Sequence, residues 1–286
     1  MPHTKGGLVI LKEMINSLPP SEQKIATYIL NNPEESILLT ALSLGEKSQT
    51  SSAAVIRLCK SLGFSGFQEL KIRVAGDLRV ETVEEYRDIE RNEDYKNIID
   101  KVTSNTIQTL RETVDIMSIK NLEQAVTALT NAKSILFIGF GASYIAARDA
   151  EQKFMRINKN VFSFSDVHIA ATAIANKGPD DVVVGISFSG NTQEAVKLLQ
   201  LAKHKNATTI SITKYGNSQV NQISDIQLYT SAAREATFRS GATSSRIAQL
   251  HVIDILLMCL ASKEYDETIK HLDETREAIS FLRDKS

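Results

Sequence analysis

Short apolar runs and longer helical segments alternate along the second part of the chain. The apolar runs are the right length for buried strands, and they are Ser134–Ile138, Val161–Phe164, Asp181–Ser187, Thr208–Thr213 and Asp225–Thr230. We expect helices between and after them, namely Ser143 to about Asn158, Asp166–Ala175, Gln193–His204 and Ser244–Ala261. Strands that alternate with helices indicate a parallel sheet covered on both faces. Residues 121–286 are therefore predicted to form an α/β sandwich.

The first 80 residues show helical periodicity instead. Pro19-Pro20-Ser21-Glu22 is a helix start signal, and Asn31-Asn32-Pro33 ends that helix after about three turns. A short helix is expected over Thr40–Glu46, and after a polar turn Thr50 or Ser51 caps the next one. The helical period then continues through Phe67, Leu70, Val74 and Leu78. We therefore predict an all-helical domain for residues 1–80.

The helix that begins at Thr50 has two chemically different sides. One side is apolar and is expected to face the core, with Val55, Ile56, Cys59 and Leu62. The other side is small, hydroxylated and basic, with Thr50, Ala53, Arg57, Lys60 and Ser61. A short helix and a turn of three or four residues precede it, which matches helix-turn-helix geometry. The pattern therefore predicts a recognition helix for the major groove of DNA.

Specific residues are expected to contact the DNA. Ser51 and Ser52 permit a close approach, while Arg57 and Lys60 reach guanine edges or phosphates. Lys71 on the following element is expected to contact phosphates, and so are Arg73 and Arg79. The alternative is that Arg57 and Lys60 are ordinary solvated charges. The preceding turn and the local positive charge favour the DNA-binding interpretation.

Length and charge divide the chain into three segments. A chain of 286 residues with 42% hydrophobic content is long enough for two globular domains. Residues 1–80 carry nine Lys/Arg and seven Asp/Glu, whereas residues 81–96 carry three basic and seven acidic side chains. Such a charged, apolar-poor stretch is typical of a linker. We therefore place an acidic linker and connecting helix at 81–120. Because the positive surplus of the first domain is small, tight operator binding predicts a homodimer or homotetramer.

Other functional classes are disfavoured by composition. The formal net charge of −1 excludes a large field of one sign. Cys59 and Cys259 form no disulfide framework, and five histidines without ligand spacing predict no local metal site. The longest apolar run, Ala248–Ala261, is shorter than a membrane span and carries charge. We expect a cytoplasmic protein with no membrane segment, metal or cofactor.

Two strand-to-helix loops are rich in glycine and hydroxyl groups. The first is Gly139-Phe140-Gly141-Ala142-Ser143, and the second is Ser187-Phe188-Ser189-Gly190-Asn191-Thr192. Helix N-termini attract phosphate through free N–H groups and the helix dipole, and glycines allow close approach. We therefore expect Gly141, Ser143, Ser187, Ser189, Gly190 and Thr192 to bind a phosphate. The alternative is that the second loop is simply a capped polar turn.

A nicotinamide cofactor is the alternative ligand for the first of these loops. Gly139 and Gly141 form a partial GxGxxG, and Asp166 lies 25 residues after Gly141, near the usual position of a ribose-binding acid. However, Tyr144 occupies the third glycine position, and a second serine-rich loop would be superfluous for a dinucleotide. The pattern therefore favours a phosphorylated ligand without a cofactor.

These motifs together resemble a known family. The segment LGEKSQTSSAAVIRLCKSLGFSGFQELK is similar to the DNA-binding domain of RpiR-type regulators. GFGAS and ISFSGNTQE resemble the flavodoxin-like sugar isomerase (SIS) domain with which those regulators sense an effector. Two segments, Arg57-Leu58-Cys59-Lys60 of the recognition helix and FRSGATSSR, resemble those of the RpiR-type regulators that sense N-acetylmuramic acid 6-phosphate.

The resemblance implies roles for further residues. It implies that the loop hydroxyls bind the effector's phosphate, and that Asp166 and His168 reach the sugar. His168 has the alternative of a helix cap or core histidine. Glu235 lies where SIS enzymes place a polar or acidic group, with a solvated loop acid as the alternative. Arg239 and Arg246 are expected either to close on the ligand or to cross a subunit boundary.

We therefore expect a regulator that binds operator DNA and a phosphorylated amino sugar and is not an enzyme. The usual polarity of such regulators implies repression that the sugar phosphate relieves. The apolar Ser244–Ala261 helix is expected to mediate dimerisation. One alternative is a sugar-phosphate isomerase or lyase with an N-terminal assembly domain. Another is a constitutive nucleoid or RNA binder with a vestigial sensor. The basic side of the helix around Arg57 favours the regulator.

Overall fold

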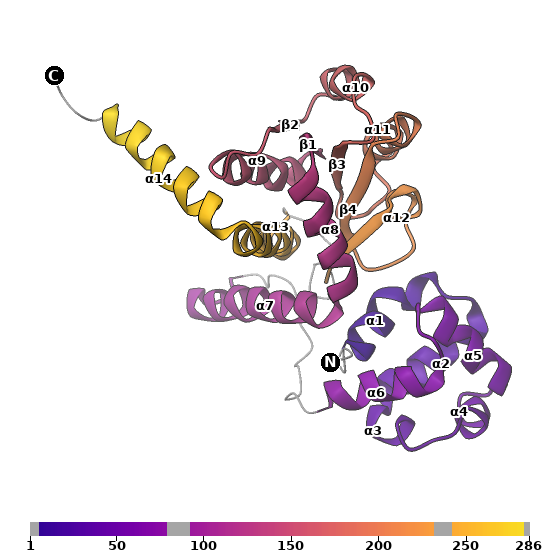
Figure 1. The fold of residues 1–286 in the computed structure, drawn as a ribbon. Coiled ribbons are helices and arrows are strands. Elements are labelled where there is room, and N and C mark those ends of the chain that lie inside the picture. The colour runs from indigo at the N-terminus through magenta and orange to yellow at the C-terminus, as the bar shows by residue number, and fades with distance from the viewer. Residues whose placement is uncertain (1–5, 79–91, 232–241, 283–286) are drawn as a thin grey trace. The chain divides into compact units, whose positions relative to one another are not determined.

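The computed structural model describes residues 6–78, 92–231 and 242–282. The chain divides into two compact units, each with its own elements (Figure 1). Unit 1 comprises Met1–Ile116 and Ser231–Ser244, and unit 2 comprises Met117–Thr230 and Ser245–Ser286. The long helix that follows the acidic segment therefore belongs with the first unit.

Unit 1 is helical over its described residues, as the periodicity predicts. Its helices are α1 (Gly7–Met14), α2 (Pro20–Asn31), α3 (Pro33–Ser36), α4 (Ala41–Lys47), α5 (Ser52–Ser61), α6 (Phe67–Asp77) and α7 (Tyr95–Ile116), with a 3-10 turn at Ile15–Ser17. Of the two cap candidates for α5, Ser51 is the cap, since its Oγ accepts from the N–H of Ala54. Thr40, which was expected inside the short helix, caps α4 instead, and its Oγ1 accepts from the N–H of Ser43. Gly63, at φ 79°, follows the end of α5.

The core-facing side of α5 differs from the sequence prediction at one position. Ala54, Val55, Leu58 and Cys59 are buried, so this side contacts the rest of unit 1 as expected. Ile56, which we expected in the core, is 41% exposed. The reason is the angular position of Ile56, which lies about 100° from Val55 on the helix and on the solvent side of the buried arc.

Unit 2 contains a five-stranded parallel sheet. Its strands are β1 (Ser134–Gly139), β2 (Val161–Phe164), β3 (Asp181–Ile186), β4 (Thr208–Lys214) and β5 (Ile226–Thr230), in the order β2-β1-β3-β4-β5. All four strand pairings are parallel, as strand–helix alternation predicts. The helices of unit 2 are α8 (Ile119–Asn131), α9 (Ala142–Met155), α10 (Val167–Ala175), α11 (Gln193–His204), α12 (Gln219–Ile223), α13 (Ser244–Lys263) and α14 (Tyr265–Phe281).

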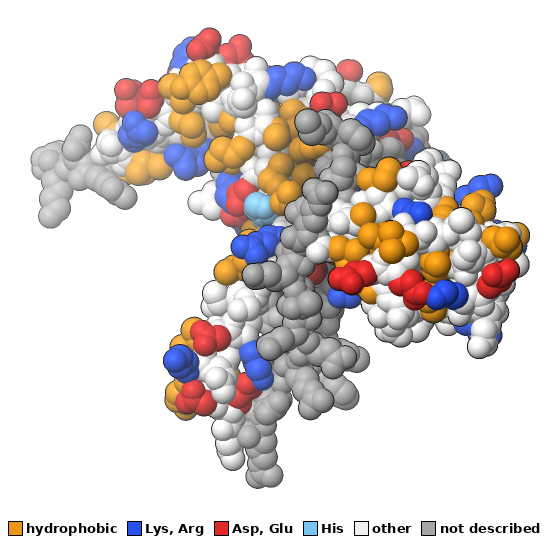
Figure 2. Space-filling view, turned by 90° about the horizontal axis from the view of Figure 1, so that it is seen from below, with side chains coloured by type: hydrophobic (Ala, Val, Ile, Leu, Met, Phe, Trp, Pro, Cys, Tyr) orange, Lys and Arg blue, Asp and Glu red, His pale blue; other side chains and the backbone are white. Residues whose placement is uncertain are grey.

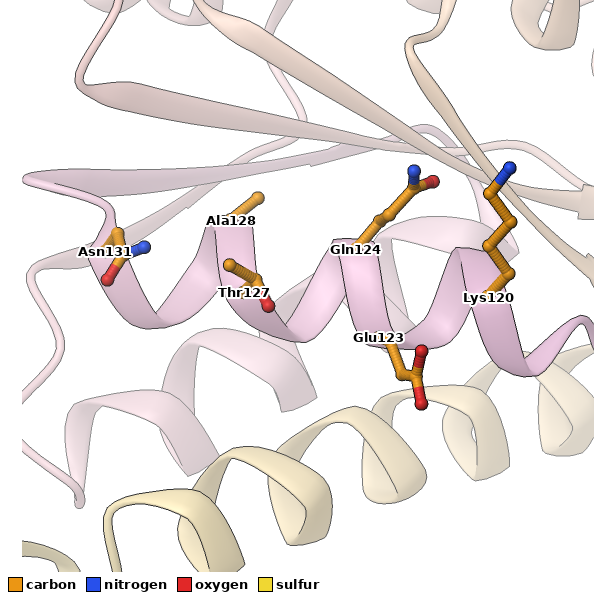
Figure 3. Close-up of a pocket in the computed structure, with 6 residues that line it drawn as sticks. All are labelled: Lys120, Glu123, Gln124, Thr127, Ala128 and Asn131. Carbon is orange, nitrogen blue, oxygen red and sulfur yellow. The ribbon is translucent and has the colours of Figure 1, made fainter.

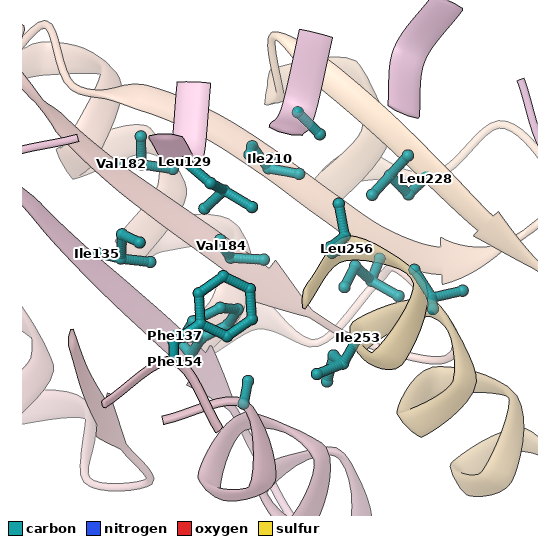
Figure 4. Packing of buried hydrophobic residues seen from close by; sticks show 14 of the residues in the cluster. Leu129, Ile135, Phe137, Phe154, Val182, Val184, Ile210, Leu228, Ile253 and Leu256 are labelled. Carbon is teal, nitrogen blue, oxygen red and sulfur yellow. The ribbon is translucent and has the colours of Figure 1, made fainter. Parts of the chain in front are cut away.

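Helices cover the sheet on both faces. On one face, side chains of α8, α9 and α13 pack against alternate residues of the strands, and Phe154 of α9 meets Phe137 of β1 edge-on, with ring centroids 5.5 Å apart (Figure 4). On the other face, α10, α11 and α12 pack against Leu136, Ile138 and Val183. The central strands β1 and β3 are buried along their whole length. The α/β sandwich is confirmed.

The apolar helix α13 packs into the core of unit 2. Five of its side chains, Ala248, Val252, Ile253, Leu256 and Leu260, are fully buried there. Met258 on the same helix is 65% exposed, so the expectation that α13 mediates dimerisation stays a prediction. Among the described residues, α13 is also the one helix long and apolar enough to cross a bilayer, and this burial is what a core helix of a globular domain shows.

Candidate functional site

The turn between α4 and α5 brings the two helices into close contact. A Cβ atom at Gly45 would lie 2.8 Å from the carbonyl carbon of Ser51, so only glycine allows this approach. The turn itself is held by hydrogen bonds. The N–H of Thr50 donates to the carbonyl of Gly45 at 2.7 Å, and the Oγ of Ser48 donates to that of Leu44 at 2.7 Å. This is the geometry of a helix-turn-helix.

The outward side of α5 is exposed, as a recognition helix requires. Ala53, Ile56, Arg57, Lys60 and Ser61 are exposed, and Ser51 caps the helix start. Arg57 makes one ion pair among the described residues, with its Nε 3.9 Å from the Oε1 of Glu22. Arg57 and Lys60 are therefore both exposed on α5, whereas Ser52 is only partly exposed.

The cations of α6 are engaged in structural contacts. The Nζ of Lys71 donates to the carbonyl of Leu39 at 3.0 Å and lies 5.7 Å from the centroid of the Phe67 ring. Arg73 pairs with Glu69 and lies over the ring of Phe64. Lys71 is therefore held against the rest of unit 1 in this structure, and its contact with DNA stays a prediction. Arg79 lies outside the described residues.

On the face shown in Figure 2, charged side chains of both signs are interspersed with apolar side chains. This agrees with the formal net charge of −1. DNA binding therefore depends on a local arrangement on α5 and its neighbours, since a net charge of −1 excludes a broad field of positive charge over the whole chain.

The two glycine- and serine-rich loops lie side by side in unit 2. Gly139 at the end of β1 is in register with Ile186 at the end of β3, so both loops leave the same edge of neighbouring strands. From β1 the chain continues to β2 on one side, and β3 lies on the other side. This is the topological switch point of the sheet, where open α/β folds bind ligands. Helices α9 and α11 both begin at this edge.

The second loop is a hydrogen-bonded turn. The Oγ of Ser187 lies 2.9 Å from the Oγ1 of Thr192 and accepts from the N–H of Gly190 at 3.2 Å. The Oγ of Ser189, an exposed residue, accepts from the N–H of Asn191 at 3.2 Å. Gly190, at φ 67°, is joined to α12 because its carbonyl accepts from the N–H of Val220. The turn therefore presents Ser189 and Thr192 at the start of α11.

The first loop ends in a buried serine with an unexpected partner. Ser143 is buried on the first turn of α9, and its Oγ accepts from the Nε2 of Gln249 at 3.2 Å. Gln249 is itself buried on α13. Sequence reasoning missed Gln249, although an amide inside the apolar run Ala248–Ala261 was a visible signal, because buried polar groups take partners.

Asp166 and His168 begin α10 after β2, at the same edge of the sheet. Both are exposed, and the Oδ1 of Asp166 accepts from the N–H groups of His168 and Ile169. These hydrogen bonds, that from Ile169 first, lower the pKa of Asp166 below its usual value. Asp166 is thus a helix cap as well as a candidate ligand residue.

Three further candidates have less structural support. Glu235 and Arg239 lie outside the described residues, and Arg246 is partly exposed on α13.

A surface depression of about 400 Å³ lies along α8, lined by Lys120, Glu123, Gln124, Thr127, Ala128 and Asn131. Its side chains diverge, since Glu123 points away from Lys120 and Gln124 (Figure 3). This depression is therefore no convergent site.

Comparisons with known proteins agree with both units. Residues 5–81 match the family model of the helix-turn-helix domain, rpiR family, and residues 128–259 match that of the SIS domain. The HTH-type transcriptional regulator YbbH of Bacillus subtilis is 48% identical over 280 residues, covering 98% of this chain and 99% of that protein. These matches define a transcriptional regulator with a DNA-binding helix-turn-helix domain and a sugar-phosphate-binding SIS domain. The chain belongs to the RpiR family.

Solved structures show the same architecture. The Vibrio vulnificus NanR protein complexed with ManNAc-6P has a TM-score of 0.61 and 27% identity, covering 96% of this chain and 99% of that chain. The sugar isomerase domain of an RpiR transcription factor from Sphaerobacter thermophilus has a TM-score of 0.56 and 22% identity over 63% of this chain and 99% of that chain. The second likeness shows the fold alone.

Proposed function

We propose that this regulator represses genes of amino-sugar catabolism from an operator that α5 recognises, and that a phosphorylated amino sugar releases it. The single observation that carries the effector site is the register of Gly139 with Ile186, which sets two phosphate-binding loops together at the switch point. Ser143, Ser187, Ser189 and Thr192 would hold the phosphate, with Gly141 and Gly190 allowing its approach. Asp166 and His168 would face the sugar.

The hydroxyl and amide groups of these loops suit reversible binding. Neither loop contains Lys or Arg, so the phosphate would be held by N–H and O–H donors and two helix N-termini. Such a site needs no chemistry on the sugar, and we propose a sensor without enzymatic turnover. N-acetylmuramic acid 6-phosphate, from the sequence resemblance, and ManNAc-6P, the molecule bound to NanR, are the effectors to test first.

The effector acts only through a difference in affinity between two states of the regulator. We propose a cytoplasmic homodimer in which binding at the switch point changes the spacing of two recognition helices. The buried residues of α13 are used within unit 2, so a contact between copies through this helix would involve its exposed residues such as Met258. Sedimentation equilibrium of the full chain, with and without effector, measures the assembly directly.

A two-part experiment tests the function. Melting of the full chain is screened against sugar phosphates, and the positive compounds are added to the chain bound to a labelled duplex from upstream of its own gene. We expect one phosphorylated amino sugar to raise the melting temperature and to lower operator affinity. Binding without any effect on DNA would contradict regulation, and conversion of the sugar to a product would favour the isomerase or lyase.

Variants of the loops localise the response. Ser189→Ala and Ser143→Ala each remove one hydroxyl from the proposed phosphate site and should weaken effector binding by about 1–3 kcal/mol. Thr127→Ala, on the exposed surface of α8, is the matched control for loss of one hydroxyl. DNA affinity without effector should be the same in all three variants. A full effector response in the Ser143→Ala/Ser189→Ala double variant would contradict the site.

A further inference from the structure

A pocket of about 320 Å³ lies in unit 1 between the start of α2 and the start of α5. It is lined by Pro20, Ser21, Lys24, Gln49, Thr50, Ser51, Ala54 and Arg57. Two of these residues are basic and none is acidic. By contrast, the larger cavity of unit 1 is lined by one basic residue, Lys12, and by the acids Glu34, Glu35, Asp77, Glu112 and Asp115. The charge of the smaller pocket therefore suits an anion.

The position of Arg57 on α5 connects this pocket to the DNA-facing surface. At 100° per residue, the exposed side of α5 is centred on Ala53 and Lys60, opposite the buried arc. Ile56 lies on one flank of that side. Arg57 lies on the other flank, next to Ala54, which also lines the pocket. Arg57 is therefore directed toward α2, whereas Lys60 lies in the middle of the outward side.

A buried carboxylate marks the same place. Glu22, on the first turn of α2, has a side chain that is only 5% exposed, and its Oε2 has no hydrogen-bond partner. Its Oε1 lies 3.9 Å from the Nε of Arg57, whose side chain is 58% exposed. A buried carboxylate is costly without a counter-charge, so Glu22 favours a guanidinium beside it. Contact at Nε leaves the two terminal nitrogens of Arg57 for a second anion.

The remaining lining residues add hydrogen-bond donors. Lys24 is exposed and has no ion pair among the residues that the structure describes. Helix α2 begins without a side-chain cap. Pro20 has no N–H, and the N–H groups of Glu22 and Gln23 both donate to the carbonyl of Pro19 at 2.9 Å, so the N–H of Ser21 is the donor left for a ligand at this helix start. Thr50 and Ser51 contribute hydroxyls from the turn before α5. Two cations, one backbone amide and hydroxyls around one small pocket are groups that hold a phosphate.

We propose that this pocket binds one phosphate of the DNA backbone, with Lys24 and Arg57 as its cationic ligands and Glu22 as a positioning residue for Arg57. This site rests on the proposed function of α5 in operator binding. Base reading then falls to the middle of the outward side, where Ala53 allows a close approach and Lys60 carries the charge. Phosphate contacts set the register of a protein on the duplex, and base contacts set its sequence preference.

The test separates the two kinds of contact. Lys24→Gln, Arg57→Gln and Lys60→Gln are compared with Lys12→Gln, which makes the same change beside the acidic cavity of the same unit. Each full-chain variant is titrated against a fluorescein-labelled operator duplex and a scrambled duplex between about 50 and 200 mM salt. Circular dichroism melting confirms that each variant is folded.

We expect Lys24→Gln and Arg57→Gln each to weaken binding to the operator duplex and to the scrambled duplex by the same factor. Each should also lower the slope of log K against log salt by about 0.9, the value for one lost phosphate contact. Lys60→Gln should reduce the operator-to-scrambled ratio by about tenfold. Lys12→Gln should change neither quantity. Unchanged slopes in the first two variants, or a lower ratio in Arg57→Gln, would overturn the phosphate pocket.

Glu22 is tested through Arg57. Glu22→Gln keeps the shape of the side chain, and we expect it to change DNA affinity in the wild-type background but not in Arg57→Gln, because its effect passes through Arg57. An equal effect in both backgrounds would refute the positioning role. A wild-type chain that binds neither duplex refutes the proposed function along with the pocket. Normal wild-type binding with unaltered variant slopes refutes the pocket alone.

Discussion

Gly190 and Gly141 lie in the two loops proposed to bind phosphate, and alanine at each position tests the conformation of its loop. Both have positive φ, 67° at Gly190 and 56° at Gly141. An alanine at Gly190 meets a backbone penalty of about 1–2 kcal/mol. Gly141, with ψ at −128°, lies outside the left-handed helical region, in backbone space that favours glycine strongly, so its penalty is about 1–3 kcal/mol. The two positions also differ in the space around the new methyl group.

That space is measurable in the structure. A Cβ atom at Gly190 would lie 2.2 Å from the Oγ and 2.5 Å from the Cβ of Ser218, whereas nothing lies within 4 Å of one at Gly141. Neither contact at Gly190 is tolerable, so the loop or the start of α12 must move, and overpacking of this kind costs about 1–3 kcal/mol. We expect Gly190→Ala to destabilise unit 2 by about 2–5 kcal/mol. Gly141→Ala should act through the backbone alone, by about 1–3 kcal/mol.

Hydrogen exchange of the full chain in low urea measures the effect within unit 2, using peptides from β3 and β4. The double variant Gly190→Ala/Ser218→Gly separates the two causes. Ser218 caps α12 through the N–H of Asn221, and glycine at an N-cap costs only a few tenths of a kcal/mol. Removing its side chain should therefore restore most of the packing loss and leave the backbone penalty.

Two results would refute this reasoning. One is a loss of no more than about 1–2 kcal/mol in Gly190→Ala, the backbone penalty alone, since the clash would then carry no free energy. The other is a double variant no more stable than Gly190→Ala. Effector binding supplies an independent readout, because displacement of the Ser187–Thr192 turn should weaken it in Gly190→Ala and recover partly in the double variant.

Three other predictions concern caps and ionisable groups. Ser51→Ala removes the acceptor for the N–H of Ala54 and should cost about 1 kcal/mol in urea unfolding followed by circular dichroism; an unchanged midpoint would contradict the capping role. Burial raises the pKa of Asp225, but hydrogen bonds from Lys203 and Thr209 outweigh it and keep that pKa below the usual 3.8. Its stabilising effect is present above that value and is lost as the pH falls below it, so Asp225→Asn should flatten the acid limb of the pH–stability curve. Burial raises the pKa of the Cys59 thiol to about 11, so iodoacetamide at pH 8 should modify Cys59 only after unfolding; rapid labelling of the native chain, monitored by mass spectrometry, would disprove it.

Much of the secondary structure was predictable from local signals. The expected strand Val161–Phe164 and the expected helix Gln193–His204 match the structure at both ends. Helix α1, by contrast, has no polar start signal, and its N-cap Gly6 makes no side-chain hydrogen bond, so the sequence did not indicate it. The sequence prediction placed Ile56 in the core because helical spacing does not show how wide the buried arc of α5 is.

The candidate sites were predictable in part. Hydroxyl groups and glycines within a few residues of each other identified both loops, because a turn is a local structure. The structural contacts of Lys71 with Leu39 and Phe67 were not visible in the sequence, since Leu39 lies 32 residues away. The same holds for Gln249, which reaches Ser143 across 106 residues.

The sequence by itself determined many of the helices, strands and capped turns, though not helix α1, because hydrophobic period and capping act within a few residues. Only the tertiary structure decided that β1 lies between β2 and β3, which places the two loops at one edge. It also decided that Glu22 lies beside Arg57 and that the apolar side of α13 is buried. These facts depend on how whole faces pack together, and burial is non-directional, so no local pattern specifies the partner.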